Sequence, residues 1–170
     1  MNSGWSSYDS KQNIDGSGWG SAVSLSDGLL AVSSSGSKNV KIFRNKGSAS
    51  KFGLGSTAEA TLTRPASENG NFGADIAINN GLLLVGAPGG NQSSTGNNRG
   101  HAYLYRYVKG SAAVWRLDTD DNVPIKEITF NPSYANKDQF GAKVGLSDSM
   151  AIIGVGDQSA TEFNKAYIYP

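Results

Sequence analysis

A short segment of the chain occurs three times, and the three repeats align without a gap. They cover residues 19–32, 72–85 and 140–153. Each begins with an aromatic residue and a glycine, and then alternates apolar and polar positions, which is the two-residue period of a half-buried strand. Because a fixed internal period decides the architecture of a chain, we expect this protein to be built from repeated β units.

A hairpin is predicted inside each repeat. Asp27-Gly28 and Asn80-Gly81 are typical of type I′ turns, in which both central residues have positive φ. Asp148-Ser149 is a weaker turn signal at the same place in the third repeat. A nearly unbroken apolar run follows each turn and is typical of a strand that is covered on both faces. These runs are residues 29–32, 82–85 and 150–153.

Two further strands complete the unit, and helical periodicity is absent. A third strand is predicted at residues 40–43, 102–105 and 166–169. A fourth is predicted at residues 59–62 and 127–130, each followed by a nearby proline. Four antiparallel strands per repeat describe a propeller blade. The predicted fold class is therefore all-β, with three β-propeller blades whose repeats start near residues 19, 72 and 140, in a single segment over residues 1–170.

The second repeat contains Phe72-Gly73, the run that ends in Gly86-Ala87-Pro88, and the strand that follows Gly100. This pattern resembles the FG-GAP repeat of integrin α-subunit β-propellers. The resemblance implies that the aromatic residues, the glycines and the small turn pack adjacent blades; the alternative is that the aromatic rings line a binding pocket. The residues of this group are Trp19, Gly20, Phe72, Gly73, Gly86, Ala87, Pro88, Phe140 and Gly141.

The other two repeats depart from this pattern. Trp19 replaces the phenylalanine in the first repeat, and Ser33-Ser34-Ser35 stands where the second has Gly-Ala-Pro. The third repeat has Gly154-Val155-Gly156 at that place. The aromatic-glycine pair and the alternating apolar positions nevertheless recur in all three.

Three blades are too few to close a propeller, which typically has about four to eight. Residues 1–18 precede the first repeat and occupy the place of a fourth strand, so we expect them to complete a blade of another chain. A homodimer would then have six blades. The competing interpretations are that the chain is a segment of a longer propeller, or that a different chain supplies the remaining blades.

The densest carboxylate cluster suggests calcium as a candidate cofactor, since Ca²⁺ prefers closely spaced oxygen ligands. The candidate ligands are Asp118, Asp120 and Asp121. The resemblance implies a calcium loop with a glycine, but Val123-Pro124 follows here, so the alternative is a solvated hairpin loop. No other cofactor is expected. Residues 89–99 form a polar loop that is a candidate for recognition.

His101 is the only histidine and is predicted to share one side of a strand with Tyr103, Tyr105 and Tyr107. Such an aromatic row could stack on a sugar, and inter-blade packing is the alternative. No Ser-His-Asp set and no paired carboxylates of the glycosidase kind can be singled out from spacing. The chain is therefore expected not to be an enzyme.

Composition excludes several classes of protein. Lys and Arg number 15 against 14 Asp and Glu, so no charge excess favours nucleic acid. No apolar run reaches the roughly 18 residues of a membrane span. The chain has no cysteine, which removes disulfide scaffolds and thiolate sites.

We expect a non-enzymatic module for binding, adhesion or structural interaction, with a protein or glycan ligand. One alternative is a carbohydrate-binding lectin propeller, and another is the propeller segment of a larger surface hydrolase. The resemblance implies an extracellular or surface-associated location. Residues 1–5 have neither the basic nor the apolar region of a signal peptide.

Overall fold

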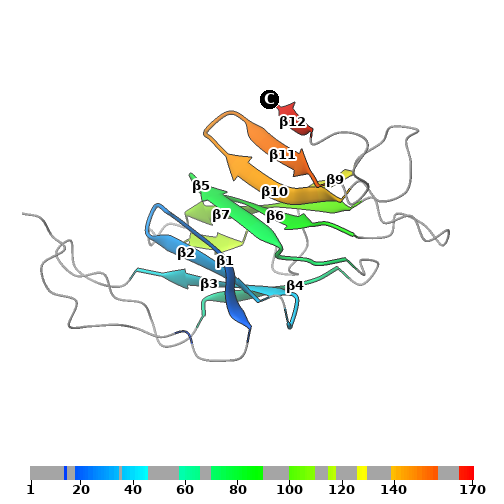
Figure 1. The fold of residues 1–170 in the computed structure, drawn as a ribbon. Coiled ribbons are helices and arrows are strands. Elements are labelled where there is room, and N and C mark those ends of the chain that lie inside the picture. The colour runs from blue at the N-terminus through cyan, green and yellow to red at the C-terminus, as the bar shows by residue number, and fades with distance from the viewer. Residues whose placement is uncertain are drawn as a thin grey trace, which may run out of the picture.

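The computed structural model describes residues 14, 18–34, 36–45, 58–65, 70–89, 100–109, 115–117, 126–129, 139–156 and 165–170. These residues form three sheets, one for each repeat, which follow one another as successive layers (Figure 1). The strands within each sheet are paired antiparallel, so the prediction of an all-β chain is confirmed. Within these ranges no helix is long and apolar enough to span a membrane.

The first sheet is the four-stranded unit that the sequence predicts. Its strands lie in the order β1-β2-β3-β4. They are β1 (Trp19–Ser26), β2 (Leu29–Ser34), β3 (Asn39–Arg44) and β4 (Ala60–Thr63). The prediction of a third strand over residues 40–43 and a fourth over 59–62 is therefore confirmed to within one residue at every end.

The second sheet has the same order, but two strands share its last edge. It is built from β5 (Asp75–Asn79), β6 (Leu82–Ala87) and β7 (His101–Lys109), with β8 (Trp115–Leu117) and β9 (Lys126–Thr129). The first half of β7 pairs with β9, which is the predicted fourth strand, and its last three residues pair with β8. Strand β8 was not predicted.

The third sheet contains β10 (Phe140–Leu146), β11 (Ala151–Val155) and β12 (Ala166–Tyr169), in that order. The structure describes three strands here. Residues 1–13 and 15–17, most of the segment predicted to complete a blade, lie outside the described residues, so that prediction is not tested. The three described sheets form an open stack, with the second sheet in the middle (Figure 1).

The hairpin turns explain why the first two strands of each repeat pair in register. Asp27 and Gly28 have φ of 53° and 75°, and Asn80 and Gly81 have φ of 46° and 75°, which confirms both type I′ turns. The third turn is different, because neither Asp148 nor Ser149 has a positive φ. A serine at the second turn position is strained at positive φ, and here the Ser147 hydroxyl oxygen accepts a hydrogen bond from the Met150 backbone N–H at 3.1 Å.

Two cores hold the stack together, one on each face of the middle sheet. Alternate residues of β6 point in opposite directions. Leu83 and Val85 lie in the core shared with the first sheet, and Leu84 lies in the core shared with the third. All three are fully buried. The near-continuous apolar run of β6 is thus explained by packing on both faces.

Candidate functional site

The aromatic residues that open the second and third repeats are core side chains. Phe72 and Phe140 are 1% and 0% exposed. The ring of Phe72 lies 5.8 Å from that of Tyr103, and the ring of Phe140 lies 6.2 Å from that of Tyr167. Each ring meets a tyrosine of its own sheet in a tilted arrangement that aromatic pairs favour. These phenylalanines therefore support the sheets and expose no ring for a ligand.

Trp19 begins the first repeat in a different environment. It is partly exposed, and the Lys41 ammonium lies 4.3 Å from the centre of a Trp19 ring. Lys41 stands where the second repeat has Tyr103. A cation–π contact thus replaces the aromatic pair at the one repeat that has no described sheet before it.

The glycines after Phe72 and Phe140 let adjacent repeats touch. Gly73 and Gly141 have φ of 83° and 89°. A Cβ on Gly73 would lie 3.0 Å from Ser33 Cβ, and one on Gly141 would lie 2.2 Å from the carbonyl oxygen of His101. A Cβ on Gly86 would lie 2.0 Å from the Gly141 carbonyl oxygen. A side chain at Gly86 or Gly141 would overlap the backbone of the neighbouring sheet, and one at Gly73 would crowd the side chain of Ser33.

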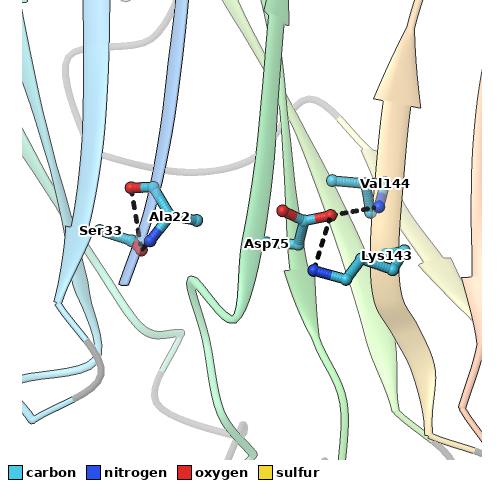
Figure 2. Close-up of polar contacts among 5 residues, drawn as sticks. All are labelled: Ala22, Ser33, Asp75, Lys143 and Val144. Atoms are coloured by element: carbon cyan, nitrogen blue, oxygen red, sulfur yellow. Dashed lines mark hydrogen bonds and ion pairs between the residues drawn. The ribbon is translucent and has the colours of Figure 1, made fainter. Parts of the chain in front are cut away.

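Ser33 takes the place of Gly86 in the first repeat. Its hydroxyl oxygen accepts a hydrogen bond from the Ala22 backbone N–H at 2.9 Å (Figure 2). Ser33 is fully buried, and this bond satisfies a hydroxyl that would otherwise be costly to bury. The departure from Gly-Ala-Pro at this position is therefore accommodated inside the first sheet.

Side chains of one repeat also bind the backbone of the next. The Ser24 hydroxyl oxygen accepts from the Ile78 N–H at 3.0 Å, and Asp75 Oδ2 accepts from the Val144 N–H at 2.9 Å. Figure 2 shows Asp75 between β5 and β10, with Lys143 Nζ 3.9 Å from the same oxygen. The first strands of the three sheets, β1, β5 and β10, which we call the inner strands, are thus linked by these side-chain hydrogen bonds and are not paired with one another as a sheet.

The hairpin turns of the three repeats are linked at one end of the stack. Asp27 Oδ2 accepts a hydrogen bond from the Asn80 backbone N–H at 2.8 Å. Asn79 Nδ2 donates to Asp148 Oδ1 at 2.8 Å. Asp27, Asn80 and Asp148 occupy the same turn position in the three repeats, and Asn79 directly precedes it at the end of β5. The same contact region therefore recurs at both junctions.

The row of His101, Tyr103, Tyr105 and Tyr107 is buried between the sheets, with 5%, 2%, 0% and 3% exposure. His101 stacks on Tyr103 at 5.9 Å. Burial raises the pKa of the Tyr105 and Tyr107 hydroxyls, and the negative charge of Glu59 raises that of Tyr107 further. These rings are placed for inter-sheet packing and are not open to a sugar.

Two predicted sites lie outside the described residues. Asp118, Asp120 and Asp121, the candidate calcium ligands, are among them, and so is the candidate recognition loop after Gly89. Within the ranges that are described, no group of three His, Asp or Glu side chains could hold a metal ion.

The two ends of the stack expose apolar side chains that the sequence analysis did not single out. The first end face consists of Val23 and Leu25 of β1, which are 64% and 57% exposed. The last end face consists of Ile152 and Ile168 on the third sheet and of Met150, which directly precedes β11; they are 45%, 65% and 51% exposed. Such exposed apolar groups mark interaction surfaces when they gather on one face.

The alignment of the repeats shows that the residues equivalent to those of the first end face are buried between sheets. Val23 and Leu25 correspond to Ile76 and Ile78, which are 4% and 6% exposed because the first sheet covers them. The sequence pattern is the same at both pairs of positions, so the difference in burial comes from the neighbouring sheet.

The same relationship holds at the other end. Met150, Ile152 and Ile168 of the third sheet correspond to Leu29, Ala31 and Ile42 of the first sheet, all fully buried against the second. The end faces are therefore inter-sheet surfaces without a described sheet on them.

Comparison with known families matches one part of this architecture. A family model for the FG-GAP repeat matches residues 58–105. Those residues are an FG-GAP repeat. The FG-GAP repeat includes β4 of the first sheet, then β5 and β6, and ends within β7 of the second sheet. One sequence unit thus connects two adjacent sheets. No curated protein matches the chain.

Proposed function

We propose that the protein is a non-enzymatic interaction module, built from FG-GAP blades and completed by further blades from self-association or from a partner chain. It acts by presenting rigid sheet surfaces and loops, and it carries out no covalent chemistry. We extend the proposal to a location outside the cell or on a surface, where the modules that it resembles work.

The observation that carries this proposal is the exposure of the two end faces. Ile168 is 65% exposed, whereas Ile42, at the same position of the first repeat, is fully buried by the second sheet. Removal of apolar surface from water is a main favourable contribution to association between proteins. Covering these faces with another sheet is therefore favourable, and it would reproduce contacts that this chain already makes twice.

The alternative of a carbohydrate-binding propeller has less support. Its strongest sequence feature was the row from His101 to Tyr107, and these side chains are buried in the described structure. Stacking on a sugar requires an exposed ring face.

Thiol reactivity tests the proposal. The chain contains no cysteine, so an introduced cysteine is the only residue of the protein that a maleimide labels through a thiol. We would make Val23→Cys and Ile168→Cys on the end faces, with Asn71→Cys as a matched control at an exposed position of the middle repeat. The rate of maleimide labelling is measured in the cells that normally make the protein and on the purified chain.

The proposal predicts slow labelling at positions 23 and 168 in the native cells, with fast labelling at position 71. Unfolding the protein in urea should make all three rates equal. If positions 23 and 168 are labelled as fast as position 71 in the native cells, the end faces are not covered and the proposed function is wrong.

A further inference from the structure

We propose that a second copy of this chain covers both end faces, with the third sheet of each copy packed on the first sheet of the other. This inference rests on the proposed function and names its partner. The arrangement is head to tail, so the first end face of one chain meets the last end face of its partner.

Each end face is the complement of the other. The second sheet uses Ile76 and Ile78 against the first sheet, and the first end face shows Val23 and Leu25 at those positions. The last end face, in turn, repeats the positions with which the first sheet packs on the second. The first and last end faces therefore carry the two sets of positions that pack against each other where neighbouring sheets meet.

The glycines provide an independent observation. At the junction between the second and third sheets, Gly86 meets Gly141, with a Cβ on Gly86 reaching the Gly141 oxygen at 2.0 Å. The same positions at the two ends of the stack are Gly154 and Gly20.

Gly20 has the positive φ of its counterparts, 94°, yet among the described residues no atom outside its chain neighbours lies within 4 Å of its Cβ position. The three atoms nearest to a Cβ on Gly154 all belong to Lys143 of its own sheet. Gly20 therefore has the backbone conformation used at a close junction, with no described residue packed against it. A second copy would bring Gly154 of one chain onto Gly20 of the other.

Closure by two copies agrees with propeller geometry. The described residues of each chain form three sheets, so two copies would bring six such sheets together, within the range of about four to eight blades that close a ring. A head-to-tail contact forms a closed ring when the rotation that relates one chain to the next, applied repeatedly, returns to the first chain. Two equivalent junctions then leave no end face exposed.

The register of the new junction follows from the existing one. Asp75 Oδ2 accepts from the Val144 N–H where the second sheet meets the third. The corresponding positions at the new junction are Lys143 of one chain and Val23 of the second copy. The Lys143 side chain is 82% exposed and Val23 is 64% exposed in the single chain, so a cysteine at either position disturbs no core within one chain.

Cross-linking tests this register. Lys143→Cys and Val23→Cys chains are mixed, unfolded, refolded together and treated with a short thiol–thiol linker. We expect a covalent dimer in the mixture and none with either variant alone, because each homodimer would place a thiol opposite a residue that has none. A mixture of Asn71→Cys and Val23→Cys serves as the matched control and should not cross-link.

Light scattering behind size exclusion provides the second arm. The unaltered chain should have twice the monomer mass, while Val23→Glu and Ile168→Glu should each be monomeric with unchanged circular dichroism. Val23→Glu keeps an intact last end face, and Ile168→Glu keeps an intact first end face. In the mixture these two intact faces can pack on each other. We expect the mixture to regain a dimer at concentrations where each variant alone is monomeric.

Several outcomes would overturn the inference. A monomeric unaltered chain would do so, and so would an assembly larger than a dimer. Cross-links within a single variant would show that like faces meet. The proposed function has a separate result: thiols at positions 23 and 168 that are protected in the native cells but reactive in the purified chain indicate a different partner.

Discussion

Asp75 holds the backbone of the following repeat, since its Oδ2 accepts a hydrogen bond from the Val144 N–H at 2.9 Å. The two residues lie on β5 and β10, which belong to different sheets and are not paired as strands. At the preceding junction the Ser24 hydroxyl oxygen has this role toward the Ile78 N–H. Adjacent sheets are thus joined at their inner strands by single side chains, together with the apolar cores.

Replacing Asp75 with alanine should destabilise the chain by about 1–2 kcal/mol, because a partly buried N–H then loses a charged acceptor. Urea unfolding at neutral pH measures the change. Asp75→Asn keeps an oxygen acceptor and should lose less. Lys143→Ala removes only the exposed ion pair at 3.9 Å and should cost less than about 0.5 kcal/mol. Equal losses for Asp75→Ala and Lys143→Ala would contradict this assignment.

Gly86→Ala should be among the most destabilising single substitutions, costing roughly 3 kcal/mol or more, because its Cβ would overlap the Gly141 backbone. Gly154→Ala is the matched control at the same position of the third repeat. Its Cβ would lie 3.3 Å from Lys143 Cβ, and we expect a loss below about 1 kcal/mol.

Both glycine variants should be compared by denaturant unfolding in the Val23→Glu background, so that self-association does not contribute. A Gly154→Ala loss as large as that of Gly86→Ala would show that the overlap with Gly141 is not what restricts Gly86.

Phe72→Ala should cost about 3–5 kcal/mol, since it removes a fully buried ring that contacts Tyr103 and Tyr105. Trp19→Ala removes a larger ring at the equivalent position, but that ring is partly exposed. We expect it to cost clearly less, because less apolar area is lost from the folded state. Thermal and urea unfolding would show the order, and a Trp19→Ala loss equal to that of Phe72→Ala would refute it.

Alkaline pH should destabilise the fold through Tyr105 and Tyr107. Burial raises the pKa of both hydroxyls above the usual value of about 10. The unfolded chain then releases these protons first, so stability is complete below pH ~10 and falls above it, by up to about 1.4 kcal/mol per pH unit for each tyrosine.

Tyr105→Phe should reduce the slope of this alkaline loss. At neutral pH it should leave stability unchanged or raise it by about 1 kcal/mol, because in the described structure the buried Tyr105 hydroxyl has no hydrogen-bond partner. The measurement is urea unfolding from pH 7 to pH 11. An alkaline slope identical to that of the unaltered chain would contradict the role of this hydroxyl.

Local sequence patterns predicted most of the strands and two of the three hairpin turns that join the first and second strands of the repeats. Asp27-Gly28 and Asn80-Gly81 determine their turns because they tolerate positive φ at both positions. Strand β8 escaped prediction because a three-residue strand carries too little periodicity to be seen. The third turn departs from type I′ because Ser149 replaces the glycine and the Ser147 hydroxyl bonds to the backbone instead.

The exposure of the end faces could not be predicted from the local sequence pattern. Val23 and Ile76 occupy the same position in the repeat and alternate with polar neighbours in the same way, yet their exposures are 64% and 4%. Gly20 and Gly141 share a positive φ, but within the part of the chain that the structure describes only Gly141 of the two has a neighbouring backbone against it.

By itself the sequence determined that the chain repeats, where most of its strands and turns lie, and which side of each strand is apolar, since these depend on the periodicity and φ preferences of neighbouring residues. Only the tertiary structure decided which apolar faces are covered. A strand's pattern encodes the face that it can bury, but burial itself depends on whether another sheet, distant in sequence, lies against that face.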